Sequence, residues 1–159
     1  MQPSLPAPLA ETLDIVGRAS RVAHDPWWLI GSAAMALHGA EVEAGDVDLL
    51  TSVADAHAFC GALDGLRVVR PPSDRFRSDM LVEILGAPMR IEVMAGFDVR
   101  HQGRWIPVAP RTRRQVIWNG QPLFVPDVAE LATLCRTFGR PKDLVRARRL
   151  DALISGAPD

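Results

Sequence analysis

Apolar residues recur along this chain at two different spacings, and each spacing predicts a different kind of element. Between residues 9 and 23, Leu9, Leu13 and Val16 follow one another at helical intervals, which predicts an amphipathic helix. Shorter apolar runs rich in valine, isoleucine and leucine are bounded by turn-forming residues, which predicts strands. These runs occupy residues 27–31, 46–52, 66–70, 76–85 and 89–97.

Two further runs with strand character follow in the second half of the chain. They cover residues 104–108 and 116–125, and Asn119-Gly120 inside the longer run is a strong tight-turn sequence. The longer run therefore predicts a hairpin rather than one straight strand.

Four more helices are predicted from their end signals. The segments 126–138 and 141–154 each have proline in or near the first turn and an aspartate close behind, both of which favour a helix N-terminus. A short helix is predicted at residues 32–38, with Ser32 as its N-cap and Gly39 as its stop. Another is predicted at residues 53–65.

This order of elements predicts an α/β (α+β) chain, with a small mixed β-sheet flanked by helices. A length of 159 residues is typical of a single domain. We expect one domain over residues 1–159, with a core at about 24–125 and a helical C-terminal tail at about 126–155.

The charge is unevenly distributed, although the net charge is only −1. Residues 1–99 carry 7 basic and 14 acidic side chains, whereas residues 100–159 carry 11 and 5. Folded against each other, such halves could hold a metal on one wall of a cleft and an anionic substrate on the other. Arginine supplies 17 of the 18 basic residues, and such richness also follows from genome base composition. RNA binding by the basic half therefore stays an alternative.

Cysteine content and apolar runs bear on the compartment. Cys60 and Cys135 are far apart and form no CxxC motif, which favours reduced, buried thiols. Residues 1–13 lack the basic and apolar regions of a signal peptide, and no apolar run reaches the length of about 20 residues that a membrane span needs. We expect a cytoplasmic protein with no membrane partner.

The stretch "DVDLL" places two aspartates in a predicted strand. Asp46 and Asp48 are two residues apart, so both side chains point to the same face. Such a pair is repulsive unless a cation lies between the carboxylates, and Mg²⁺, or alternatively Mn²⁺, prefers oxygen ligands. Glu92 interrupts the apolar run 89–97 and is the candidate third carboxylate. Asp79 and Glu83 are alternatives, although a solvated sheet face explains them more simply.

The Gly31-Ser32 step before the short helix is a candidate phosphate site. Gly31 lets the backbone approach a ligand, and the amides that begin a helix bind phosphate. The Ser32 hydroxyl adds a hydrogen bond. A phosphate site followed by two metal-binding aspartates suits the handling of a nucleoside triphosphate.

The stretch "LIGSAAMALHG" followed by "DVDLL" resembles the signature of the nucleotidyltransferase superfamily, whose fold is shared with DNA polymerase beta. The resemblance implies that Gly31 and Ser32 bind the triphosphate. It also implies that Asp46, Asp48 and Glu92 form a catalytic, metal-binding set.

Small bacterial members of the superfamily are the most similar in pattern, namely toxin components of abortive-infection systems and antibiotic nucleotidyltransferases. The stretch "FGRPKDLVRARRL" resembles a lysine-aspartate segment of the abortive-infection type, which implies that Lys142 faces the nucleotide phosphates. Relatives often carry an arginine and a threonine before the aspartates, where this chain has Val42 and Ala44. Glu41 and Glu43 make this loop acidic.

The expected activity is Mg²⁺-dependent transfer of a nucleoside monophosphate from a triphosphate such as ATP to a hydroxyl, with release of pyrophosphate. The acceptor (RNA, a protein or a small molecule), the base and the oligomeric state stay open, as does a protein partner or a homodimer. The acidic loop and the missing arginine favour an alternative, a non-catalytic nucleotide- or partner-binding module of a toxin–antitoxin system.

Overall fold

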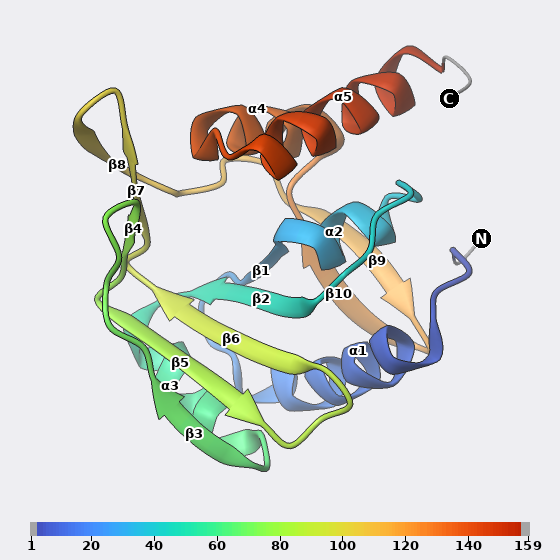
Figure 1. Ribbon diagram of the computed structural model, residues 1–159. Coiled ribbons are helices and arrows are strands. Elements are labelled where there is room, and N and C mark those ends of the chain that lie inside the picture. Colours follow the sequence, from blue (N-terminus) through green and yellow to red (C-terminus); the bar gives the residue numbers. More distant parts are fainter. Residues whose placement is uncertain (1–2, 157–159) are drawn as a thin grey trace.

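The computed structural model describes residues 3–156, and its centre is a five-stranded mixed sheet (Figure 1). The strand order is β1-β2-β6-β5-β3. Strands β2 and β6 are parallel, and the other neighbouring pairs are antiparallel. The bounds are β1 Trp28–Ile30, β2 Asp46–Thr51, β3 Leu66–Val69, β5 Met80–Leu85 and β6 Arg90–Ala95. The predicted mixed sheet is confirmed.

Side chains alternate across the two central strands, and this alternation separates the core from the polar face. Val47 and Leu49 of β2 are fully buried in the main core with Val93 of β6. The residues between them, including Asp48 and Glu92, point to the opposite face because strand side chains have a period of two. The sheet therefore has an apolar face and a face that carries carboxylates.

Helices cover both faces. On the apolar side lie α1 (Ala7–Ala19), continued by a 3₁₀ turn at Ser20–Val22, and α3 (Val53–Ala62). On the carboxylate side α2 (Gly31–Leu37) packs against β1 and β2, and the paired helices α4 (Val128–Phe138) and α5 (Pro141–Ser155) lie across that face (Figure 1). The predicted helical C-terminal region is confirmed. No helix within residues 3–156 is long and apolar enough to cross a membrane.

Two small sheets extend the central one. Strands β9 (Arg114–Trp118) and β10 (Gln121–Val125) form the predicted hairpin around Asn119-Gly120. The other sheet has the order β4-β7-β8, with bounds Phe76–Arg77, Asp98–His101 and Arg104–Pro107.

Two expectations about strands were wrong. The predicted strand 76–85 is interrupted at Ser78-Asp79, and its two parts, β4 and β5, belong to different sheets. Strand β7 was missed because the charged residues Asp98 and Arg100 disguise its alternation. As expected, Cys60 and Cys135 are buried free thiols. Residues 1–2 and 157–159 of the predicted domain lie outside the described residues.

Candidate active site

Three carboxylates meet on the polar face of the central sheet. Asp48 lies directly opposite Glu92 because β2 and β6 are parallel neighbours, and Asp46 lies one pleat away on the same face. Asp46, Asp48 and Glu92 each offer an oxygen within 4.8 Å of the others. The structure thus brings together the three carboxylates that the sequence suggested, and neither Asp79 nor Glu83 belongs to the group.

The electrostatics of this cluster favour a cation. Burial, followed by the negative charges of Asp46 and Glu92, raises the pKa of Asp48 well above its usual range. Burial is also the chief cause that raises the pKa of Glu92. The Oδ1 atom of Asp48 is buried and has no hydrogen-bond partner among the described residues. A buried, unpartnered carboxylate oxygen among two other carboxylates fits a hard divalent cation such as Mg²⁺.

Gly31 fixes the distance between helix α2 and this cluster. Its φ of +67° is in the left-handed region, and a Cβ built on it would lie 2.6 Å from Oδ2 of Asp48. Only glycine therefore allows the helix to begin against this carboxylate. The expected N-cap role of Ser32 was wrong, because the helix already begins at Gly31 and Ile30 is its N-cap, without a side-chain cap. Ser32 is buried in the first turn and lines the same cavity as Asp48.

Arg90 and Glu83 border the cluster on the sheet. Arg90 donates a hydrogen bond of 3.0 Å to Oδ2 of Asp46 and forms ion pairs of 3.6 Å with Glu83 and Glu92. Glu83 was expected on a solvated face, but it is only 5% exposed. Its burial is possible because Arg70 and Arg90 both pair with its Oε1 atom, at 3.2 and 3.6 Å.

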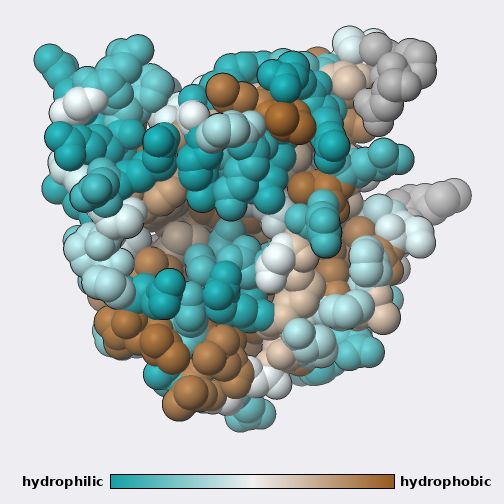
Figure 2. Space-filling view, in the orientation of Figure 1, coloured by the Kyte–Doolittle hydropathy of each residue, from teal (hydrophilic) through white to brown (hydrophobic). Residues whose placement is uncertain are grey.

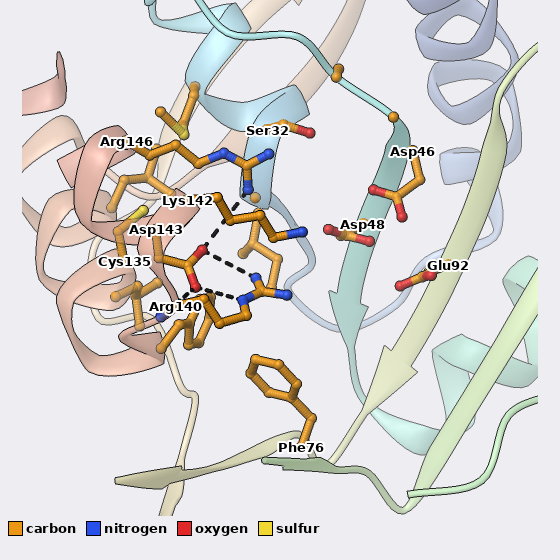
Figure 3. A pocket seen from close by; sticks show the side chains of 18 of the residues that line it. Ser32, Asp46, Asp48, Phe76, Glu92, Cys135, Arg140, Lys142, Asp143 and Arg146 are labelled. Atoms are coloured by element: carbon orange, nitrogen blue, oxygen red, sulfur yellow. Dashed lines mark hydrogen bonds and ion pairs between the residues drawn. The ribbon is translucent and has the colours of Figure 1, made fainter. Parts of the chain in front are cut away.

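Cations from α5 face the carboxylates across the cleft (Figure 3). Arg140, Lys142 and Arg146 all line the cavity that contains Asp46, Asp48 and Glu92. Figure 3 shows their side chains extending from α5 toward the carboxylates. The sequence pointed only to Lys142, although Lys142 and Arg146 are four residues apart and so share a helix face.

A buried carboxylate orients two of these cations. Asp143 is 1% exposed and accepts hydrogen bonds of 2.6 and 3.1 Å from Nε and Nη2 of Arg140. Its other ion pair, with Arg146, is 3.9 Å long. Asp143 also accepts a bond from the backbone N–H of Arg140 and so closes the first turn of α5. Within residues 3–156 no carboxylate forms an ion pair with Lys142, which is exposed at the cavity.

The cavity between these walls has a volume of about 600 Å³. Figure 2 shows the hollow on this side of the molecule, with hydrophilic residues at its rim and apolar residues inside. Part of its lining comes from three phenylalanines, Phe76, Phe97 and Phe138, whose ring centroids are 5.5–6.0 Å apart. An acidic wall, a basic wall and an aromatic lining suit a ligand that has phosphates at one end and a planar ring at the other.

A second cavity of about 700 Å³ continues from the first. It runs between residues 3–9, the loop 39–45 and Met89. Glu43, Ala44, Gly45 and Arg90 line both cavities. The second cavity therefore borders the carboxylate site, and none of the α5 cations lines it.

Several of the remaining arginines in the basic half have structural contacts, among them Arg113 and Arg149. Arg113 lies 3.5 Å from the ring centroid of Phe124 and donates a hydrogen bond to the carbonyl of Trp27. Arg149 donates a hydrogen bond of 2.7 Å to the carbonyl of Glu41. These contacts account for part of the arginine content without nucleic acid.

Comparison with known proteins bears on the fold. No family model and no curated protein sequence matches this chain. Among solved structures, a protein from Thermotoga maritima described as a candidate nucleotidyltransferase is similar, with a TM-score of 0.70 and 20% identity over 91% of each chain. The antibiotic-resistance factor ANT(2'')-Ia, solved with adenylyl-2''-tobramycin, has a TM-score of 0.57 and 13% identity, over 92% of this chain and 89% of that one.

The lincosamide antibiotic adenylyltransferase LnuA, bound to lincomycin, is also similar in structure. Its TM-score is 0.60 at 9% identity, and the match covers 94% of this chain and 98% of that one. At such low identities these similarities establish the fold. The chain has the nucleotidyltransferase fold that the sequence pattern predicted.

Proposed function

We propose that this chain is a Mg²⁺-dependent nucleotidyltransferase, which moves a nucleoside monophosphate from a triphosphate to a hydroxyl acceptor. The observation that carries the proposal is the cleft itself: three carboxylates on β2 and β6 face three cations, on α5 and at its N-cap, across one cavity. One wall suits metal ions and the other suits phosphates, and a metal–triphosphate complex needs both.

Asp46, Asp48 and Glu92 would hold the divalent cation. A bound divalent cation would supply Lewis-acid chemistry, lowering the pKa of the attacking hydroxyl and neutralising charge on the phosphate oxygens. Because burial raises the pKa of Asp48, the cation would compete with protons for the oxygens of this carboxylate.

Gly31 and Ser32 bind the β- and γ-phosphates at the beginning of α2, while Lys142 and its neighbours on α5 neutralise their charge. Asp143 orients Arg140 and Arg146 rather than touching the substrate. The aromatic lining around Phe76 receives the base.

The acceptor hydroxyl approaches through the second cavity and attacks the α-phosphorus. The new bond joins the acceptor oxygen to the α-phosphorus, and the bond from this phosphorus to the α–β bridging oxygen breaks. Pyrophosphate leaves with that oxygen, and the hydroxyl proton passes to Glu92. Catalysis comes chiefly from positioning and from electrostatic stabilisation of the phosphate oxygens.

Calorimetric titration of the four nucleoside triphosphates, with and without Mg²⁺, tests the site. We expect Mg²⁺-dependent binding to the wild type and none to the Asp46→Asn/Asp48→Asn variant. Pyrophosphate release during incubation with candidate acceptors then tests transfer, which Asp48→Asn should abolish while the circular dichroism spectrum is unchanged. Release at the wild-type rate in Asp48→Asn would exclude the proposal.

A second candidate, nucleotide binding without transfer, is favoured by one observation. Glu43 lines the cavity and adds a negative charge near Asp46, and Val42 stands where members of the superfamily often carry an arginine. This candidate predicts the same Mg²⁺-dependent binding with no pyrophosphate release with any acceptor.

A further inference from the structure

Arg90 has contacts on the sheet that the proposed reaction does not use. It is the direct cross-strand partner of Asp46 and lies two residues before Glu92 on β6, so all three side chains share one face. Its guanidinium bonds Oδ2 of Asp46 at 3.0 Å and pairs with Oε1 of Glu92 at 3.6 Å. Two of the three candidate metal ligands are thus already paired with a protein cation.

The pairing continues away from the metal site. Glu83 of β5 lies directly opposite Glu92, and like charges in that position repel. Arg90 lies within 3.6 Å of both carboxylates, and Arg70 lies 3.2 Å from Glu83 on the other side. A row of alternating carboxylates and guanidiniums therefore crosses the sheet, from Asp46 of β2 through Arg90 of β6 and Glu83 of β5 to Arg70 directly after β3.

Glu83 gives Arg90 a second place to bind. It is 5% exposed, and its Oε1 atom already forms ion pairs with Arg70 and Arg90, which fix it in the sheet. Arg90 itself is about two-fifths exposed and lines both cavities. If it leaves Asp46 and Glu92, it keeps a buried partner and stays at the junction of the cavities.

We propose that Arg90 is a resident counter-ion of the carboxylate site, which neutralises Asp46 and Glu92 in the metal-free protein and is exchanged for a divalent cation when metal and triphosphate bind. The inference rests on the proposed function. Its consequence is that metal and nucleotide bind as a unit, because a free cation must first displace a charge that is already in place.

The exchange predicts that replacing Arg90 raises the metal affinity of the site, although most substitutions beside a metal site lower it. A side chain that only supports the site would, when replaced, weaken metal binding. A competing cation would, when replaced, strengthen it. We expect Arg90→Met and Arg90→Gln to bind Mn²⁺ about ten-fold more tightly without nucleotide, the effect of losing a partly solvated charge a few ångströms from the ion. Arg90→Lys keeps the charge and should bind Mn²⁺ as the wild type does.

Paramagnetic resonance of free Mn²⁺ in solutions of the full chain measures this affinity directly and needs no acceptor. The matched control is Arg77→Met. The Arg77–Asp98 pair has side-chain exposures of 48% and 23%, against 42% and 23% for Arg90–Asp46, and it lies outside the carboxylate site. Arg77→Met should leave Mn²⁺ binding unchanged.

Equal or weaker Mn²⁺ binding in both Arg90→Met and Arg90→Gln would overturn the inference. If the wild type binds Mn²⁺ and loses it in Asp48→Asn, such a result removes only the role of Arg90. If neither the wild type nor any Arg90 variant binds Mn²⁺, the inference and the proposed function both fail. Arg90→Met and Arg90→Gln introduce side chains of different polarity. If circular dichroism shows that one of them misfolds, the other still tests the inference.

Discussion

A Cβ on Gly31 would lie 2.6 Å from Oδ2 of Asp48, so the first residue of α2 and the central carboxylate of the sheet leave no room for any other side chain. This contact sets the distance between the beginning of α2 and the carboxylate-bearing face of β2. A glycine with φ of +67° is needed on two grounds, its backbone conformation and the space.

Gly31→Ala therefore should lower stability and also displace Asp48. Gly39→Ala is the matched control, because Gly39 also has a positive φ, +89°, but nothing lies within 4 Å of its Cβ position. We expect both variants to lose about 1–2 kcal/mol from left-handed backbone strain. Only Gly31→Ala should also lose the rise in melting temperature that Mg²⁺ and a nucleotide give. An equal Mg²⁺ response in the two variants would show that the close approach is not needed.

The carboxylate cluster should make the metal-free protein less stable as the pH rises. Because burial raises the pKa of Asp48, the folded state binds this proton more tightly than the unfolded state. The free energy of unfolding then falls as the pH rises from about 3.9, the unfolded value, through the higher folded pKa. Asp48→Asn should remove this fall and be more stable than the wild type at neutral pH. Urea denaturation with a chelator across this range measures both.

Magnesium should reverse this pH dependence. Metal competes with protons for the same oxygens, so the stability gained from Mg²⁺ should grow as the pH rises in the wild type. Asp48→Asn should gain nothing at any pH. If the free energy of unfolding in chelator depends on pH in the same way in the wild type and in Asp48→Asn, the metal-free fold does not raise the pKa of Asp48.

Asp143→Asn should weaken nucleotide binding through the arginines that Asp143 orients. The substitution leaves Arg140 and Arg146 without their buried partner, and Arg140 is 34% exposed, so we expect a loss of about 1–3 kcal/mol in stability. Calorimetry below the melting temperature should also show weaker binding of Mg²⁺-nucleotide. The control is Asp151→Asn, which breaks the exposed pair with Arg136 and should cost less than about 0.5 kcal/mol. Unchanged nucleotide affinity in Asp143→Asn would leave Asp143 with a purely structural role.

Lys142→Met should discriminate between phosphate chains of different length. If Lys142 neutralises the outer phosphates, its loss should weaken triphosphate binding about ten-fold and leave monophosphate binding nearly unchanged. Arg148→Met is the control, since Arg148 is exposed on the same helix and does not line the cavity. Isothermal titration with both nucleotides gives the comparison. Equal losses of affinity for the triphosphate and the monophosphate would show that Lys142 does not bind the outer phosphates.

The carboxylate wall could be predicted from the sequence because it depends on local geometry. Two aspartates at i and i+2 must share a face of any strand, and one glutamate in an apolar strand must have a reason to be there. The contact of Gly31 with Asp48 was not predicted, because it depends on the pairing of Ile30 in β1 with Asp48 in β2. The strand β7 and the break at Ser78-Asp79 could not be predicted, since no glycine or proline marks the break.

The basic wall depends on how distant segments pack, and the sequence pattern contained only part of it. Lys142 was suggested, but Arg140 reaches the cavity because buried Asp143 holds it there. Glu83 gives the opposite case. Its alternation with apolar neighbours is typical of a solvated face, yet ion pairs with Arg70 and Arg90, from strands that the pattern cannot order, allow it to be buried.

The parallel pairing of β2 with β6 gives the site one more property. The two strands are neighbours in space, but α3, β3, β4 and β5 lie between them in the chain. An ion held by Asp48 and Glu92 would therefore act as a reversible cross-link that closes a long loop, and closing such a loop removes entropy from the unfolded chain. Metal loading would then slow hydrogen exchange throughout the central sheet and α3, rather than only at the residues that touch the ion.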